Sequence, residues 1–159
     1  MNAHDVTAEE LGRLRLFENL SDATLTTLAA TAAHRRLADG ATLYAQGGDP
    51  RELFVVVRGR LVLHVSDGGR STMVQIVYAP DVLGWSALRE DARWLTTARA
   101  IGPVEVVALP LVAILDAIEA GGPDARRLAQ RLFGVGAAHL DAVRQQLQQP
   151  SRETIITGG

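Results

Sequence analysis

Hydrophobic positions recur at two periods along this chain, and the first part has the period of helices. The stretch from Thr7 to Glu10 has the pattern of a capping box, in which each side chain accepts a hydrogen bond from the other residue's backbone N–H, and leucines follow at helical spacing. A second helix is expected to begin at Ser21 and to end near His34. Residues 1–35 are therefore predicted to form N-terminal helices.

Residues 36–110 carry short apolar runs separated by turn signals, which is the pattern of a β-barrel. Arg58-Gly59 is typical of these signals, and their spacing predicts seven or eight strands. The run from Leu53 to Val57 is apolar at every position, so we expect it to be buried on both faces.

Helical spacing returns in residues 111–149, which are expected to form C-terminal helices. A short helix is predicted from Leu111 to Glu119, and a long helix follows a glycine-rich break. Pro150 ends this long helix because proline lacks the backbone N–H that the next turn needs. Residues 150–159 are predicted to form a tail.

The long helix carries two apolar stripes. The first consists of Leu128, Leu132 and Val135, and the second of Phe133, Gly136, Leu140, Val143 and Leu147. We expect the first stripe to cover the barrel and the second to form a homodimer through the C-terminal helix. The alternative is a single wide face that packs on the domain.

Composition places the chain among globular proteins of one domain. It has 159 residues, of which 47% are hydrophobic and 21% charged. No apolar run approaches the ~20 residues that a membrane-spanning helix needs, and the polar, acidic first ten residues do not resemble a signal peptide. We therefore expect a cytoplasmic protein that does not contact a membrane.

Charge and metal-binding residue types narrow the function classes. A net charge of -2 and a pI near 6.1 do not favour direct DNA binding, because nucleic-acid affinity comes largely from neutralised phosphates. The absence of cysteine excludes disulfides, thiolate nucleophiles and cysteine-ligated zinc. The histidines at positions 4, 34, 64 and 139 lie on separate predicted elements, so neither a metal site nor catalysis is expected.

Residues 37–69, LADGATLYAQGGDPRELFVVVRGRLVLHVSDGG, resemble the barrel signature of the cyclic-nucleotide-binding domain of the Crp/Fnr regulator family. The matching positions are Gly40, Leu43, Gly47, Asp49, Phe54, Val55, Val57 and Gly59. The resemblance implies an α+β fold, in which a double-stranded β-helix (a jelly-roll, cupin-like barrel) has N-terminal helices and a long C-terminal helix. It also implies a sensor of small ligands rather than an enzyme.

Residues 84–100, GWSALREDARWLTTARA, fall where this family places its phosphate-binding cassette. For members that bind cyclic AMP or cyclic GMP, the resemblance implies a glutamate after the first glycine, for the ribose 2′-hydroxyl, and an arginine at the head of the next strand, for the phosphate. Here these positions carry Trp85 and Trp94. Losing two charge-assisted hydrogen bonds costs about 3–6 kcal/mol, so we expect weak or no binding of cyclic AMP. Arg93 would restore the phosphate contact only through a bulge that turns it to the other face.

The expected ligand site follows from this placement. Its cassette residues are Gly84, Trp85, Ser86, Ala87, Leu88, Arg93, Trp94, Thr96 and Thr97, and the part of the long helix expected to lie over the ligand is His139, Leu140 and Asp141. The implied ligand is a cyclic nucleotide or another small anionic molecule, and no further cofactor is implied.

The two tryptophans leave two hypotheses open. If Trp85 and Trp94 line an open pocket, the chain is a stand-alone sensor or regulatory module with altered ligand specificity. If they fill the pocket, the chain is a ligand-free pseudo-sensor that acts as a dimeric protein–protein interaction module.

The regulators of this family have a DNA-binding helix-turn-helix domain after the long helix. Only PSRETIITGG follows Gln149, and this segment is too short for such a domain. The cassette is also similar to that of a subgroup of stand-alone bacterial members. We therefore expect a stand-alone form that binds no DNA directly and acts on an unidentified protein partner.

Overall fold

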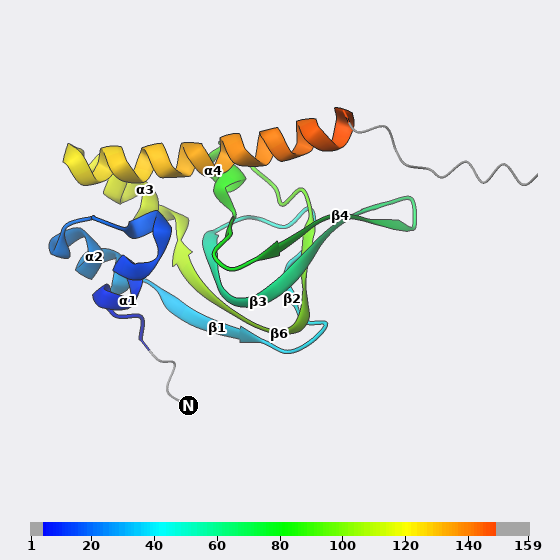
Figure 1. Ribbon diagram of the computed structural model, residues 1–159, viewed down its shortest axis with the longest axis horizontal. Coiled ribbons are helices and arrows are strands. Elements are labelled where there is room, and N and C mark those ends of the chain that lie inside the picture. The colour runs from blue at the N-terminus through cyan, green and yellow to red at the C-terminus, as the bar shows by residue number, and fades with distance from the viewer. Residues whose placement is uncertain (1–4, 149–159) are drawn as a thin grey trace, which may run out of the picture.

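The computed structural model describes residues 5–148, without the side chains of residues 139, 140, 142, 143 and 146–148. The architecture is α+β, with helices at one end, a rolled antiparallel sheet beside them and a long helix across both (Figure 1). In chain order the elements are α1 (Ala8–Arg13), η1 (Arg15–Phe17), α2 (Asp22–Ala29), β1 (Ala33–Leu37), β2 (Thr42–Tyr44), β3 (Glu52–Asp67), β4 (Arg70–Tyr78), β5 (Val82–Leu83), η2 (Trp85–Leu88), β6 (Thr97–Pro110), α3 (Leu111–Glu119) and α4 (Gly122–Gln148).

The described strands form one antiparallel sheet in the order β1-β6-β3-β4. β2 also pairs with β6, and β5 also pairs with β3. β1 and β2 lie along different parts of β6, since β1 pairs with residues 104–108 and β2 with residues 98 and 99. The long strands β3 and β6 therefore connect the two halves of a rolled sheet.

The number of strands differs from the prediction, since the described residues form six strands instead of seven or eight. The turn signal at Arg58-Gly59 produces a bulge within β3, where the register with β6 shifts on both sides of Arg58. Gly59 has a φ of 84°, and a Cβ at this position would overlap the carbonyl oxygen of Pro103. Only glycine allows this close approach, so the bulge bends the strand without ending it.

The N-terminal helices begin as predicted, but the second ends earlier than expected. Thr7 Oγ1 accepts a hydrogen bond from the Glu10 N–H at 3.1 Å, and the Thr7 N–H donates to Glu10 Oε2 at 3.1 Å. α2 ends at Ala29, and His34 lies in β1, which pairs with β6 along its whole length. This pairing overrides local helix propensity, and the boundary expected after residue 35 falls inside a strand.

A carboxylate of α4 holds the start of α2. The hydroxyls of Ser21 and Thr24 donate to Asp124 Oδ2 at 2.5 Å and 2.6 Å. The hydrogen bonds from Ser21 and Thr24 hold the pKa of Asp124 below its usual value. The N-terminal helices are therefore attached to α4 by polar contacts as well as by packing.

Two arginines of α4 continue this attachment along the helix. Arg127 Nη1 donates to the carbonyl oxygen of Asn19 at 2.6 Å, and Arg131 Nη1 donates to the carbonyl oxygen of Leu16 at 3.2 Å. Leu16 belongs to η1 and Asn19 to the turn between η1 and α2, so both acceptors lie in one short segment. This segment therefore lies directly beside the face of α4 that carries Arg127 and Arg131.

The hydrophobic core has two parts. One joins the helices to the sheet and includes Phe17, Ile114 and Leu128, and the other fills the roll and includes Leu61 and Trp94. Successive residues of β3 contribute alternately to the two parts, so residues 53–56 are all buried. The predicted burial of this run on both faces is confirmed except at Val57, which is 38% exposed.

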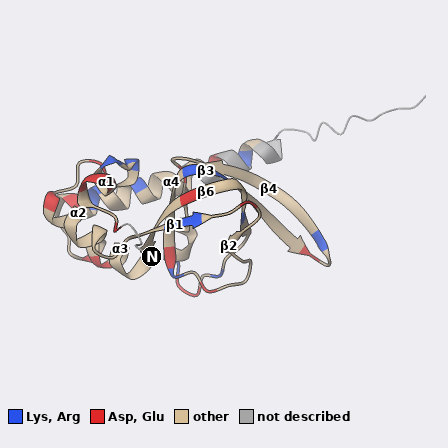
Figure 2. Cartoon of the chain, turned by 90° about the horizontal axis from the view of Figure 1, so that it is seen from below, with Lys and Arg blue, Asp and Glu red and all other residues tan. Residues whose placement is uncertain are grey.

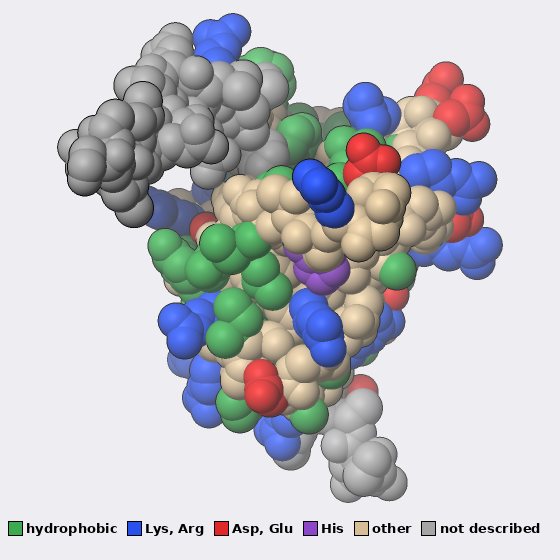
Figure 3. All heavy atoms as spheres, turned by 90° about the vertical axis from the view of Figure 1, so that its right-hand side faces the viewer, with side chains coloured by type: hydrophobic (Ala, Val, Ile, Leu, Met, Phe, Trp, Pro, Cys, Tyr) green, Lys and Arg blue, Asp and Glu red, His purple; other side chains and the backbone are tan. Residues whose placement is uncertain are grey.

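β4 lies at the edge of the sheet and exposes apolar side chains. Met73 is 62% exposed and Tyr78 is 58% exposed. Figure 2 shows that the length of β4 carries no charged residue except near the hairpin tip. Figure 3 views the molecule from the hairpin end and shows hydrophobic side chains gathered on one side of this face. The roll therefore presents an apolar edge away from the N-terminal helices.

Candidate ligand cavity beneath the long helix

A cavity of about 920 Å³ lies between the rolled sheet, the η1 segment and α4. Its apolar walls include Leu63 and Val77 from the roll, Leu83 from β5 and Val135 from α4. The cassette segment and Arg15 and Arg131 complete the lining. A cavity of this size, mostly apolar with a few polar groups, has the character of a small-molecule site.

The cassette begins at a glycine with a left-handed backbone. Gly84 has a φ of 97°, and the Ala87 N–H donates to its carbonyl oxygen at 3.0 Å to form the turn of η2. A Cβ on Gly84 would lie 2.9 Å from the carbonyl oxygen of Glu52. Glycine is therefore required both for the backbone angle and for the close contact with β3. The turn places Trp85 and Ser86 in the cavity lining.

Trp94 is fixed in place by backbone hydrogen bonds and by aromatic stacking. The Gly47 N–H donates to the Trp94 carbonyl oxygen at 2.7 Å, and the Trp94 N–H donates to the Gly48 carbonyl oxygen at 3.0 Å. The indole ring stacks on Tyr44, with ring centroids 3.8 Å apart and an angle of 12° between the planes. Trp94 is only 8% exposed and also lines the cavity. It lies in the loop before Thr97, the first residue of β6, and not at the head of the strand, where the resemblance to the family implied it.

Tyr44 places a phenol next to the stacked indole. Burial raises the pKa of the Tyr44 hydroxyl above its usual value, and a side-chain hydrogen bond with Thr96 offsets part of this increase. Tyr44 and Thr96 both line the cavity. They provide a neutral polar group at the aromatic end of an otherwise apolar wall.

Trp85 lies against the backbone of α4. A Cβ placed on Gly136 would lie 3.1 Å from Trp85 Cε3. Gly136 is buried by this contact, so it belongs to the inner face of α4 and not to the outer stripe expected for dimerisation. Gly134 and Ala138 line the cavity nearby. The small residues of this helix therefore allow the close approach of an indole ring from the same chain.

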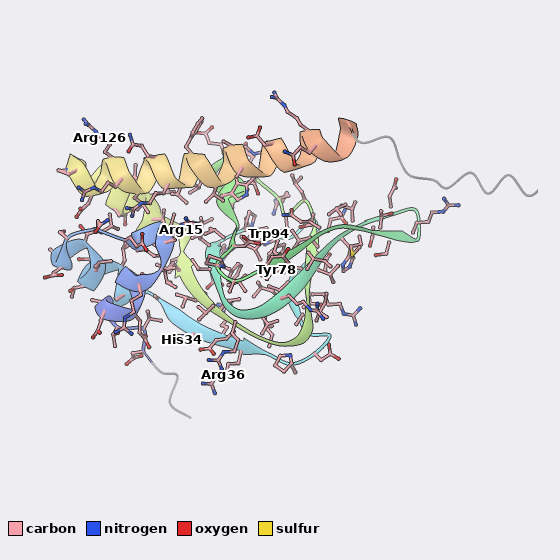
Figure 4. The ribbon with its side chains drawn as sticks, viewed as in Figure 1. Arg15, His34, Arg36, Tyr78, Trp94 and Arg126 are labelled. Carbon is pink, nitrogen blue, oxygen red and sulfur yellow. The ribbon has the colours of Figure 1, made fainter. Side chains whose placement is uncertain are left out.

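Four charged residues line the cavity. Arg15 extends from η1 and Arg131 from α4, and the acidic residues are Glu18 and Asp81. In Figure 4, Arg15 lies on the helical side and Trp94 inside the roll, both below α4. None of these four residues belongs to the cassette segment.

The structure divides the predicted site residues into groups. Gly84, Trp85, Ser86, Trp94 and Thr96 line the cavity together. Ala87 and Leu88 pack against the helical core, and the Thr97 hydroxyl accepts a hydrogen bond from the Gln46 N–H at 3.0 Å. Asp141 is exposed, and the side chains of His139, Leu140, Val143 and Leu147 lie outside the described residues.

Arg93 lies away from the cavity. It borders a separate hollow of about 360 Å³, where its Nη1 lies 3.9 Å from Asp49 Oδ1. Its side chain is 64% exposed. The phosphate contact considered for Arg93 needs the guanidinium on the cavity side, and the described geometry places it elsewhere.

Sequence reasoning missed the residues that come from other elements. Arg15, Tyr44 and Arg131 reach the cavity from η1, the end of β2 and α4. One signal was present for Arg131, since it lies between Leu128 and Val135 of the stripe expected to face the barrel. Arg15 carried no such signal because only the tertiary fold brings η1 to the mouth of the roll.

The rolled sheet, the short helical turn after β5 and the long helix define an α+β jelly-roll domain with a cavity beneath its long helix. The family model for the cyclic nucleotide-binding domain matches residues 34–120, which is more than half of the 159 residues. The chain therefore belongs to the cyclic nucleotide-binding domain family, as the barrel signature implied.

Solved structures share this fold. The N-terminal domain of a transcriptional regulator from Streptomyces coelicolor A3(2) is 26% identical, with coverage of 90% of this chain and 98% of that chain and a TM-score of 0.63. The sensor domain of the transcriptional regulator DNR from Pseudomonas aeruginosa is 20% identical, with coverage of 80% and 91% and a TM-score of 0.68. A cyclic nucleotide-binding domain from Methylobacillus flagellatus KT is 13% identical, with coverage of 88% and 79% and a TM-score of 0.73.

A search of curated sequences and the hydropathy of the helices add two results. A search of curated protein sequences gives no match. Between residues 5 and 148, no helix combines the length and the hydropathy needed to cross a membrane.

Proposed function

We propose that this chain is a ligand-sensing regulatory module with altered ligand specificity, in which a small molecule binds beneath α4 and cyclic AMP binds weakly or not at all. The module acts without catalysis, in the cytoplasm, and through a protein partner. Ligand binding changes the position of α4 relative to the roll, and the partner reads this change.

One observation carries this proposal: both tryptophans at the cassette positions line a cavity of about 920 Å³. At these positions the family resemblance implies a glutamate and an arginine in members that bind cyclic AMP. The contact between Trp85 and Gly136 supports the proposed response. Because the indole ring lies against the backbone of α4, a ligand that pushes the ring toward the helix must also move α4.

A second function is favoured by the burial of Trp94. Its ring is 8% exposed and stacks on Tyr44 within the core of the roll. These contacts support a pseudo-sensor, in which the indole replaces part of a nucleotide and the module acts only by binding other proteins. The two functions differ in whether the cavity beneath α4 is occupied by a small molecule.

We expect cyclic AMP to raise the melting temperature of the protein only slightly. With two charge-assisted hydrogen bonds missing, a dissociation constant near 1 mM is expected, so cyclic AMP at about 1 mM adds only about 1–2 °C. A cognate ligand at about one hundred times its dissociation constant raises the melting temperature by about 5–10 °C. Thermal unfolding against cyclic mononucleotides, cyclic dinucleotides and small organic anions measures both effects.

A cavity-filling variant provides the control for this experiment. Gly134 lines the cavity and a Cβ on it would have no neighbour within 4 Å, so Gly134→Phe adds a ring at the cavity wall without a clash at the Cβ. A ligand of the cavity must lose its effect in this variant. A shift of more than about 5 °C with cyclic AMP that Gly134→Phe abolishes contradicts the altered specificity. No shift with any ligand, together with tryptophan fluorescence that a soluble quencher does not reach, favours the pseudo-sensor.

We also propose that the module is a homodimer through the outer face of α4. Phe133 points outward from this helix and is 79% exposed, which is unusual for a large aromatic side chain. Phe133→Asp is expected to raise the dimer dissociation constant about tenfold or more, because aromatic residues dominate interface energies. Light scattering after size exclusion, at several protein concentrations, distinguishes a mass of 17.0 kDa from twice that mass.

Val112→Asp on α3 is the matched control, because Val112 is also apolar and is 67% exposed. The mass of this variant is expected to match that of the unmodified protein. A monomeric unmodified protein, or a dimer that persists in the Phe133→Asp variant, contradicts the proposed interface.

A further inference from the structure

The arginines that line the cavity lie outside the cassette. Arg15 comes from η1 and Arg131 from α4, and the roll and the cassette supply aromatic and apolar surfaces. Positive charge and apolar surface are thus on different walls of the same cavity. This separation indicates which parts of a ligand each wall can hold.

Arg131 is held in position at the edge of the cavity. Its Nη1 donates to the carbonyl oxygen of Leu16 at 3.2 Å, and the residue is partly buried. A guanidinium has five N–H donors in a rigid plane, so this bond orients the group and leaves donors for another acceptor. The remaining donors belong to a side chain that is already fixed at the wall of the cavity.

Arg15 carries a second positive charge at the cavity wall. It is exposed, and its side chain forms no hydrogen bond or ion pair with the described residues. Neither acidic residue of the lining forms an ion pair with Arg15 or Arg131 within 4 Å. Asp81 Oδ2 accepts the Tyr78 N–H at 3.1 Å, and the Glu18 residue in the lining is exposed.

The aromatic wall does not have the form of a cation-binding cage. Tyr44 and Trp94 stack on each other at 3.8 Å, so the facing surfaces of both rings are already covered. A cation needs an open aromatic face. The exposed parts of these rings, with Leu63 and Val77, instead present a surface suited to a flat apolar group.

We propose that the cavity binds an organic anion with a flat apolar body, whose acidic group is held by Arg131 and Arg15 and whose body lies against Trp85 and Trp94. This inference rests on the proposed function, since it assigns the class of ligand for the same cavity. The acidic group lies between η1 and α4, and not at the turn of η2 where the cassette of the family would hold a phosphate.

Three probes with the same ring test the charge preference in the unmodified protein. They are 2-naphthoate, which is an anion, 2-naphthylmethanol, which is neutral, and 2-naphthylmethylammonium, which is a cation. Isothermal titration calorimetry is expected to show that naphthoate binds about tenfold or more tightly than either of the others. Equal affinities, or a preference for the cation, would overturn the proposal without any mutation.

Variants then assign the preference to particular arginines. Arg131→Ala and Arg15→Ala are each expected to weaken naphthoate binding about tenfold and to leave the affinity for the neutral probe unchanged. Arg127→Ala is the matched control for Arg131, since it also loses a hydrogen bond to a carbonyl of the same segment but does not line the cavity. Arg126→Ala is the control for Arg15, because Arg126 points away from the domain (Figure 4). A preference for naphthoate that survives in both arginine variants would also overturn the proposal.

The outcomes separate this inference from the proposed function. If all three probes bind alike and Gly134→Phe abolishes their binding, the cavity is a ligand site and only the inferred ligand class is wrong. If none of the probes binds and no small molecule changes the melting temperature, the proposed sensor and the inferred ligand class are both wrong.

Discussion

Replacing Trp94 by alanine is expected to lower the free energy of unfolding by about 3–5 kcal/mol, the range for large aromatic side chains lost from a core. Trp94 is buried within the roll, and its ring stacks on Tyr44 at 3.8 Å. The substitution removes this stacking and leaves a void beside the existing cavity. Since domains of this size are stable by about 5–15 kcal/mol, the loss is a large fraction of the total. Urea denaturation of the two proteins measures it.

Two further variants show whether the loss of stability is specific to position 94 or follows the removal of either tryptophan. Trp94→Phe keeps an aromatic ring against Tyr44 and is expected to lose less stability than Trp94→Ala. Trp85→Ala is expected to lose less than Trp94→Ala because Trp85 is only partly buried. If Trp94→Ala loses no more than Trp85→Ala, Trp94 does not have the structural role assigned to it.

Gly84→Ala is expected to lower the free energy of unfolding by about 2–4 kcal/mol, because it combines two separate costs. A residue with a side chain at a φ of 97° adopts a strained left-handed backbone. Its Cβ would also lie 2.9 Å from the carbonyl oxygen of Glu52 and 3.1 Å from the Trp94 ring. The backbone of β3 cannot easily move, so the start of the cassette must shift. Chemical denaturation measures the change in stability, and tryptophan fluorescence reports the shift.

Gly47→Ala separates the two costs. Gly47 has a φ of 81°, close to that of Gly84, but a Cβ at this position would meet nothing within 4 Å. In this variant, the free energy of unfolding is therefore expected to fall only by the cost of the left-handed backbone, about 1–2 kcal/mol. Equal losses at the two positions would show that the predicted overlap with β3 is relieved without cost.

Local patterns predicted the elements whose ends are set by neighbouring residues. The capping box of Thr7 and Glu10 is present, and α3 spans Leu111–Glu119 as predicted. A cap or a proline acts within one helical turn, so its effect is visible in the sequence. The end of α2 was wrong because β1 begins at Ala33 only through its pairing with β6.

The same distinction applies to the candidate site. The sequence located the cassette, since the order of glycine, hydroxyl and aromatic residues there is local, and five of its predicted residues line one cavity. The sequence did not separate Arg93 from the cavity or bring Arg15 and Arg131 into it. The direction of a side chain in an irregular loop depends on contacts with distant segments, such as the pairing of Trp94 with Gly47 and Gly48.

By itself, the sequence determined the family, the order of helices and strands, and the replacement of two polar cassette positions by tryptophan. Only the tertiary structure decided that Trp94 is buried within the roll, that Trp85 lies against Gly136, and that two arginines from distant elements line the cavity. The physical reason is the range of the interactions. Turns, caps and periodicity depend on residues a few positions apart, whereas burial and the walls of a cavity depend on elements that approach one another only in the folded chain.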